Sequence, residues 1–264
     1  MTICIAGIVE SNKIIAITDK MITLGGNVAT RYEIGENNKV IKLTEKSLAL
    51  FAGNVIAANE IMAIAKTKIE AESNPTITRL ATLFKESYHE HWKKGLNEQL
   101  LQRFNISLEV FVSNQRVLDQ ALVGKINEII LNANLGVEIL VAGIDTQPHI
   151  FLIGNPGTIM TLDPIGYGLI GSGSQHAQLS MIENEYNSGI SKENGLFALL
   201  EAKRRAEYDP GVGELCDIVI IDGGFDKLTE QNVNKITRQF EKTLNSIKRS
   251  KNNAAVKIYG HTHD

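Results

Sequence analysis

Residues 2–19 read TICIAGIVESNKIIAITD, and this stretch decides the fold class. Two short runs rich in β-branched residues, Ile3 to Val9 and Ile14 to Thr18, flank residues 10–13 (ESNK), which are typical of a hairpin turn. Both runs are almost continuously apolar and do not alternate with polar residues. This pattern predicts strands that are covered on both faces, inside a layered structure.

The rest of the chain continues in alternating blocks of strands and helices. Asn54 follows a strand and precedes apolar residues at helical spacing, so we expect it to be a helix N-cap. Further strands are predicted over residues 40–43, 47–52, 137–143, 149–153, 157–162 and 216–221. Helices are predicted from residue 54, from about residue 76, within a helical middle of about 96–134, and over 175–185, 192–208 and 229–248.

This order of elements predicts an α+β fold in which helices pack outside sheets. No break in composition divides residues 1–264, so a single domain is expected, with an extra C-terminal tail over about 249–264. Apolar residues make up 43% of the chain and charged residues 22%, which is typical of a globular protein and excludes a disordered one.

Charge and cysteine content exclude several classes of protein. The 27 basic and 30 acidic residues give a net charge of −3, which provides no electrostatic case for a nucleic-acid or membrane partner. Cys4 and Cys216 are too few for a disulfide framework and suit a reducing compartment. No run approaches the roughly 18 apolar residues of a membrane helix, and the first residues lack the basic start of a signal peptide. We therefore expect a cytoplasmic protein.

Thr2 is the first candidate for chemistry, because removal of Met1 would make it the N-terminal residue. A free α-amine titrates near pH ~7.7–8.0. It can therefore be neutral at working pH and accept the proton of the hydroxyl beside it, which leaves Oγ1 as a nucleophile. A threonine at the second position is common, so Thr2 alone does not establish a role.

Two charged residues supply the context that such a nucleophile needs. Asp19 ends a buried apolar run, where an unpaired carboxylate is costly, and Lys39 begins the strand that leads to Gly53. A lysine beside the terminal amine would lower the pKa of that amine by like-charge repulsion and would stabilise developing negative charge. A carboxylate would pair with this lysine and fix its position. Either residue alone is more often an ordinary charge at a loop end.

Gly53, Ser172 and Asp209 complete the set of candidate residues. Gly53 lies where a strand gives way to a helix, which is a place where backbone N–H groups can bind an oxyanion; a tight turn is the structural alternative. Residues 171–174 (GSGS) also join a strand to a helix, but they lack the P-loop lysine and the GxGxxG spacing, so nucleotide binding is rejected. Ser172 is instead expected to be a hydrogen-bond partner, and Asp209 lies in a turn.

Two histidine patterns look like metal sites, and both are rejected. His89 and His91 are two positions apart and lie on different sides of a helix, so they cannot bind one ion together. Residues 260–264 (GHTHD) look like the GHxH box of metallophosphoesterases, but the aspartate and histidine ligands of that family are absent upstream. An exposed tail is expected there.

Taken together, these positions resemble the proteasome-like branch of the N-terminal-nucleophile hydrolases, which comprises proteasome β subunits, the bacterial protease subunit HslV and the bacterial homologue Anbu. The start, TICI, is similar to the Anbu start Thr-Tyr-Cys-Val, and IGSGS resembles the signature before the third helix of the family. The segments that carry the resemblance follow the order of the family over roughly residues 2–222: they are residues 2–5, 14–19, 39–41, 51–53, 170–177 and 209–213.

The resemblance implies a four-layer αββα sandwich and a threonine-type peptidase or amide hydrolase. It assigns the attacking oxygen to Thr2, the tuning of the amine to Lys39, and the orientation of that lysine to Asp19. The Gly53 N–H would bind the oxyanion. This chemistry requires no metal and no organic cofactor.

The resemblance further places Ser172 and Asp209 in a network around the amine. It implies a polypeptide substrate and a homo-oligomer, either a ring or an open helical assembly. No residue indicates an ATP-dependent unfoldase partner such as the one that serves HslV.

The sequence departs from the family pattern in places. Seventeen positions separate Thr2 from Asp19, one more than is usual. An extra residue in the turn at 10–13 keeps Thr2 at the start of its strand, whereas an earlier one would put Ile3 at the nucleophile position and imply an inactive subunit. Val212 stands where the family has a serine that helps to bind the amine. These departures leave an inactive structural subunit of the same fold as an alternative. A small-molecule amidase, which shares the nucleophile but opens its site to solvent, is a second alternative.

Overall fold

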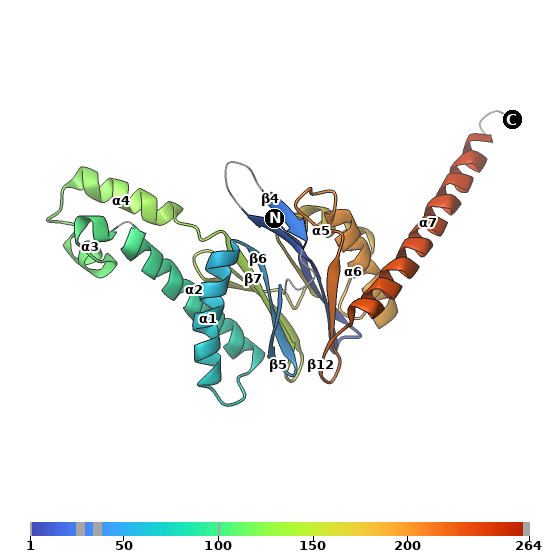
Figure 1. Cartoon of the computed structure of the whole chain (residues 1–264), viewed down its shortest axis with the longest axis horizontal. Coiled ribbons are helices and arrows are strands. Elements are labelled where there is room, and N and C mark those ends of the chain that lie inside the picture. The colour runs from blue at the N-terminus through green and yellow to red at the C-terminus, as the bar shows by residue number, and fades with distance from the viewer. Residues whose placement is uncertain (1, 25–29, 34–38, 100, 261–264) are drawn as a thin grey trace.

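The computed structural model describes residues 2–24, 30–33, 39–99 and 101–260. The fold is α+β, with two five-stranded antiparallel sheets and a two-stranded ribbon (Figure 1). The ribbon consists of β3 (Met21–Leu24) and β4 (Thr30–Glu33). Among the described residues, no helix combines the length and the apolar character that crossing a membrane requires.

The first sheet is built around the hairpin predicted from residues 2–19. Val9 pairs with Lys13 and Cys4 with Thr18, so the two strands run antiparallel around a turn at residues 10–12. Strands lie in the order β10 (Tyr167–Ile170), β1 (Cys4–Val9), β2 (Lys13–Asp19), β11 (Cys216–Ile221) and β12 (Phe225–Lys227).

In the second sheet, neighbouring strands are also consecutive in the sequence. Its strands lie in the order β5 (Val40–Thr44), β6 (Ser47–Gly53), β7 (Val137–Ile144), β8 (Pro148–Gly154) and β9 (Thr158–Thr161). Between β6 and β7 the chain leaves the sheet and forms α1 (Val55–Glu70), α2 (Ile77–Gln99), a 3-10 turn (Leu101–Phe104), α3 (Leu108–Asn114) and α4 (Gln120–Asn132).

The two sheets pack face to face. Cys4 and Ala6 from β1 share one buried cluster with Leu50 from β6 and Leu140 from β7. Ile5, which lies between Cys4 and Ala6, points to the opposite face of the sheet. Both faces of this strand are therefore buried, which explains its continuous apolar run and confirms the prediction.

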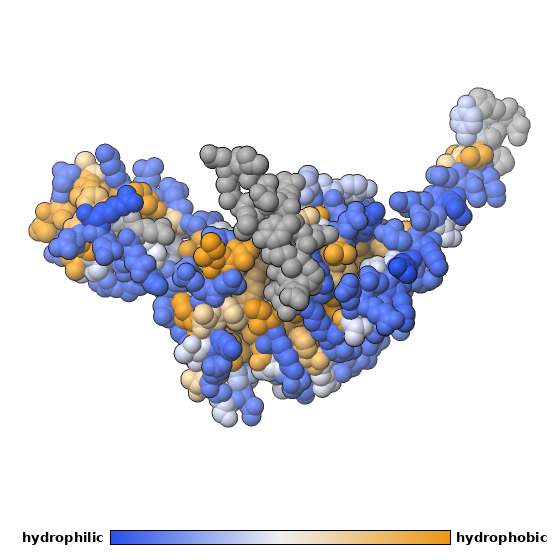
Figure 2. Space-filling model, viewed as in Figure 1, coloured by the Kyte–Doolittle hydropathy of each residue, from blue (hydrophilic) through white to orange (hydrophobic). Residues whose placement is uncertain are grey.

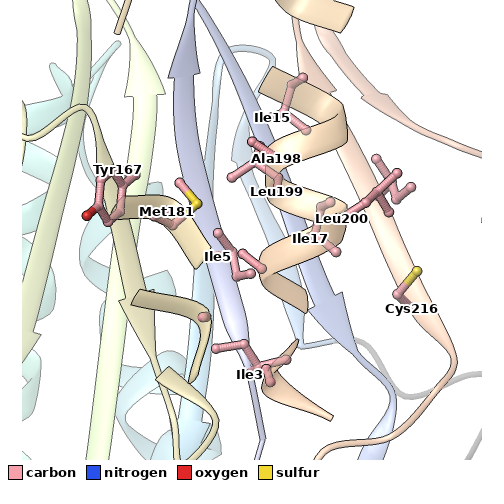
Figure 3. Packing of buried hydrophobic residues seen from close by; sticks show 14 of the residues in the cluster. Ile3, Ile5, Ile15, Ile17, Tyr167, Met181, Ala198, Leu199, Leu200 and Cys216 are labelled. Atoms are coloured by element: carbon pink, nitrogen blue, oxygen red, sulfur yellow. The ribbon is translucent and has the colours of Figure 1, made fainter. Parts of the chain in front are cut away.

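Helices cover the outer faces of both sheets. On the first sheet, α5 (Ser174–Glu183), α6 (Lys192–Ala206) and the start of α7 (Glu230–Gly260) enclose a cluster that includes Ile3 and Leu199 (Figure 3). On the second sheet, Ile61 of α1 and Phe84 of α2 pack against β6, β7 and β8.

The C-terminal helix is longer than the sequence pattern predicts. We expected a helix over 229–248 followed by a tail, but α7 continues to Gly260 and its far end extends away from the sheets (Figure 1). Val256, Ile258 and Tyr259 are exposed on this far end. Residues 261–264, which hold the rest of the GHTHD motif, lie outside the described residues, as does Met1.

Candidate active site

The structure brings Thr2, Asp19 and Lys39 together. Thr2 precedes β1, Asp19 ends the neighbouring strand β2, and Lys39 precedes β5 of the other sheet. The Thr2 hydroxyl donates a hydrogen bond to Asp19 Oδ1 and accepts one from Lys39 Nζ. The Lys39 ammonium lies 2.7 Å from Asp19 Oδ1. A hydroxyl that donates to a carboxylate and accepts from an ammonium is polarised, which is one way to make an oxygen more nucleophilic.

Asp19 is the centre of this cluster. Its side chain is 0% exposed, and besides Lys39 and the Thr2 hydroxyl it accepts three backbone N–H groups. The N–H of Ile3 donates to Oδ1 at 2.9 Å, while those of Met21 and Gly213 donate to Oδ2, each at 3.1 Å. This number of donors compensates the loss of hydration of a buried carboxylate.

Ser172 faces the backbone nitrogen of Thr2. The Thr2 N–H donates to Ser172 Oγ at 3.3 Å, and the Gly173 N–H points at Thr2 O, also at 3.3 Å. Gly171 has a φ of +101°, and a Cβ there would lie 2.3 Å from Thr2 O. Glycine at this position therefore lets the loop at 171–173 close onto the first residue of the predicted mature chain.

Gly53 ends β6 directly before α1. Its φ is +101°, and a Cβ would lie 1.9 Å from Gly136 O, so no larger residue fits without movement of the backbone. Asn54 caps α1, as predicted, by accepting hydrogen bonds from Ile56 N and Ala57 N. The backbone of Gly53 thus lies at the positive end of a helix.

An open cleft of about 560 Å³ joins these parts. Thr2, Ser172 and Gly53 all contribute to its wall. The other lining residues are Ala52, Asn134, Gly136, Val137, Glu138, Gly154, Asn155 and Gly171. A volume of this size is in the range of small-molecule and peptide side-chain sites.

Asp209 is not brought into this cluster. Its carboxylate accepts the Gly211 N–H of its own turn at 2.7 Å, and no hydrogen bond to Thr2 or Ser172 is found in the part of the chain that the structure describes. The same loop instead contributes the Gly213 N–H, which reaches Asp19. Val212 is buried, and its Cγ2 would lie 2.8 Å from a Cβ at Gly173, so it packs beside the loop that holds Thr2.

The two neighbours of Thr2 have other roles. Ile3 is 0% exposed and lies among the apolar residues packed against α6 (Figure 3). Cys4 donates to Phe51 O at 3.2 Å, and burial raises the pKa of its thiol to about 12. A thiol that stays neutral is a poor nucleophile. Of these three residues, Thr2 is the one whose side chain is hydrogen-bonded to both Asp19 and Lys39, while the Cys4 thiol lies near this cluster and bonds to Phe51 O.

Sequence reasoning missed Glu138, a charged residue that lines the cleft. It follows Val137 at the start of β7, and its Oε2 accepts the Gly171 N–H at 3.0 Å. A charge in an otherwise apolar strand run, Val-Glu-Ile-Leu-Val, was the available signal.

No protein-family model matches the chain, and no curated protein matches it.

Proposed function

We propose that this chain is a threonine-type peptidase or amide hydrolase of the proteasome-like branch of the N-terminal-nucleophile hydrolases. Removal of Met1 would free the amine of Thr2. The observation that carries the proposal is the position of the Thr2 hydroxyl, which contacts both the Lys39 ammonium and the Asp19 carboxylate beside an open cleft.

The proposed reaction uses the two functional groups of Thr2. Oγ1 attacks the carbonyl carbon of the scissile amide, and its proton passes to the neutral α-amine. The amine then gives this proton to the leaving nitrogen, which breaks the C–N bond and leaves an ester on Oγ1. Water hydrolyses this ester in the same way and restores the hydroxyl.

Other residues support each step of this reaction. Lys39 stabilises the developing negative charge on Oγ1 and lowers the pKa of the nearby α-amine, while Asp19 holds Lys39 in place. The Gly53 N–H, at the positive end of α1, would bind the oxyanion. Ser172 Oγ would accept a hydrogen bond from the freed amine, since it accepts one from the same nitrogen already. No metal or organic cofactor is needed.

The layered packing of sheets and helices supports a four-layer αββα sandwich. Two sheets meet face to face, α1 and α2 cover one outer face, and α5 and α6 cover the other. This is the arrangement expected of the four-layer αββα sandwich that N-terminal-nucleophile hydrolases have in common.

Exposed apolar side chains support self-association. They gather on the helical middle, as orange patches over α3 and α4 (Figure 2): Phe104, Val110, Val112, Val117, Ile129 and Leu131 are all exposed. Patches of this kind commonly mark protein–protein contacts. We propose a homo-oligomer that acts on polypeptide.

One residue favours the alternative of an inactive structural subunit. Val212 is apolar and cannot accept a hydrogen bond from the terminal amine, so the amine would have fewer partners than in the active members of the family. The loss of one hydrogen bond is worth about 1 kcal/mol, which would weaken the site without removing its nucleophile.

Hydrolysis of fluorogenic peptides over a range of pH tests the proposed function. The α-amine must be neutral to accept a proton, so we expect kcat/KM to rise with pH through the amine pKa and to level off above it, by about pH 8. A protein with a residue before Thr2 that is not removed should be inactive, because its Thr2 nitrogen is an amide. Equal activity of the two proteins, or no hydrolysis at any pH, would contradict the proposal.

A further inference from the structure

Glu138 occupies an inward-facing position of β7. Residues 138, 140 and 142 share one face of the strand, and Leu140 and Ala142 belong to the apolar cluster between the two sheets. Ala52, which pairs with Glu138 across the sheet, belongs to the same cluster. The face that carries Glu138 is therefore apolar along the strand and becomes charged only at the end, where the sheets open into the cleft.

The carboxylate of Glu138 is held in place but not neutralised. Its Oε2 accepts the Gly171 N–H at 3.0 Å, which links the second sheet to the loop around Thr2. Within the described residues, no lysine or arginine forms an ion pair with this side chain, and Oε1 has no hydrogen-bond partner. Glu138 is exposed, so the free oxygen is open to a ligand in the cleft.

Glu138 also sets the charge of the cleft. It is the charged residue among the described residues that line the cleft, where its neighbours are glycines, asparagines and other uncharged side chains. The nearby Lys39 is offset by Asp19 at 2.7 Å. Among the described residues around the cleft, the carboxylate of Glu138 is therefore the charge that a ligand meets without a counter-charge beside it.

We propose that Glu138 makes the cleft select polypeptides that carry a lysine or arginine side chain beside the scissile bond. This rests on the proposed function, because Thr2 defines where that bond lies. A cationic side chain would pair with Oε1, whereas an acidic side chain at the same position would be repelled. The length of lysine and arginine side chains also lets their charged ends reach a wall of the cleft while the peptide backbone stays at Thr2.

Peptide hydrolysis by the wild type and the Glu138→Gln variant tests this selection. Glutamine has the same size and still offers an oxygen to the Gly171 N–H, so the variant removes the charge alone. With three peptides that differ only in a lysine, glutamine or glutamate beside the scissile bond, we expect kcat/KM to fall in that order. The ratio of kcat/KM for the lysine peptide to kcat/KM for the glutamate peptide should drop about tenfold in Glu138→Gln, since attraction and repulsion are both lost. In the wild type this ratio should also become smaller at high salt.

A matched control separates the effect of a charge in the cleft from the effect of the overall charge of the protein. Glu128 is exposed on α4 and does not line the cleft, so Glu128→Gln changes the net charge equally and should leave the ratio unchanged. If all three peptides were hydrolysed and the lysine-to-glutamate ratio of kcat/KM were the same in the wild type and in Glu138→Gln, the proposed selection would be overturned. The proposed function would still stand.

A binding measurement tests the selection without catalysis. In the Thr2→Ala variant, fluorescence anisotropy of the labelled lysine and glutamate peptides should show tighter binding of the lysine peptide by about fivefold. Adding Glu138→Gln to this variant should abolish the difference. Equal binding of the two peptides to Thr2→Ala would overturn the selection, whereas absence of hydrolysis by the wild type alongside selective binding would overturn only the proposed function.

Discussion

Replacement of Thr2 by alanine will abolish peptide hydrolysis, lowering kcat/KM by about 10³-fold or more. The reason is chemical: alanine keeps the terminal amine but has no oxygen to attack the carbonyl. The Lys39–Asp19 ion pair at 2.7 Å does not depend on the hydroxyl. We therefore expect the free energy of unfolding to fall by only about 2 kcal/mol, the value of the two hydrogen bonds that the hydroxyl makes to Asp19 and Lys39. Steady-state kinetics and urea unfolding measure the two effects.

Thr2→Ser is the matched control for this variant. Serine keeps both the hydroxyl and the α-amine, so it should retain measurable activity, reduced because its side chain lacks the methyl group that restricts χ1. Activity of Thr2→Ala close to that of the wild type would show that another residue is the nucleophile. The same loss of activity in both variants would show that the methyl group, and not the oxygen, matters.

Replacement of Asp19 by alanine will destabilise the whole protein, by about 3–5 kcal/mol. Asp19 is fully buried and is the counter-ion of Lys39, so its removal leaves a largely buried ammonium without a counter-ion. It also leaves the N–H groups of Ile3, Met21 and Gly213 without their acceptor. Thermal unfolding should show a fall in Tm of roughly 10 °C, together with loss of hydrolysis.

Glu70→Ala is the control for the loss of an ion pair in general. Glu70 lies 3.8 Å from Lys66 on the exposed surface of α1, where such a pair contributes less than about 0.5 kcal/mol. The loss of unfolding free energy in Asp19→Asn should lie between the losses in Asp19→Ala and Glu70→Ala, because an amide oxygen still accepts hydrogen bonds but carries no charge. If Asp19→Ala unfolded within about 1 kcal/mol of the wild type, the carboxylate would not be the centre of the cluster.

Parts of the fold could be predicted because they depend on neighbours in the sequence. The hairpin of β1 and β2 follows from two apolar runs around a turn, and the start of α1 from a capping asparagine. Asp19 was recognised as a candidate for the same reason, since a carboxylate directly after a buried run needs a partner. Cys216–Ile221 was predicted with the bounds that β11 has.

Other parts depend on contacts between distant segments and escaped prediction. The short strands β3, β4 and β12 carry weak patterns of their own and form by pairing with a neighbour. Helix α7 passes through a polar stretch at residues 248–253 (KRSKNN), where its apolar spacing stops, so the pattern gave no reason to extend it to Gly260. The Gly213 N–H reaches Asp19 across 194 positions of the chain, a distance at which no local pattern can act.

The positions of Ser172 and Asp209 also depend on distant segments of the chain. Both were expected beside the amine of Thr2, and both lie in loops whose course is set by the elements around them. The loop at 171–173 is brought to Thr2 by the pairing of β10 with β1, and Ser172 lies against the Thr2 nitrogen. The turn that holds Asp209 directs Gly213 inward and keeps the carboxylate within the turn.

The intact mass of the protein after treatment with a peptide epoxyketone tests the central claim most directly. An epoxyketone reacts with a hydroxyl and an α-amine on the same residue, so it reports a free N-terminal threonine and not a hydroxyl in general. We expect the untreated protein to lack Met1 and the treated protein to gain one probe, located on Thr2 by fragmentation and absent from Thr2→Ala. A protein that retains Met1 and gains no probe would contradict the claim that Thr2 is the nucleophile.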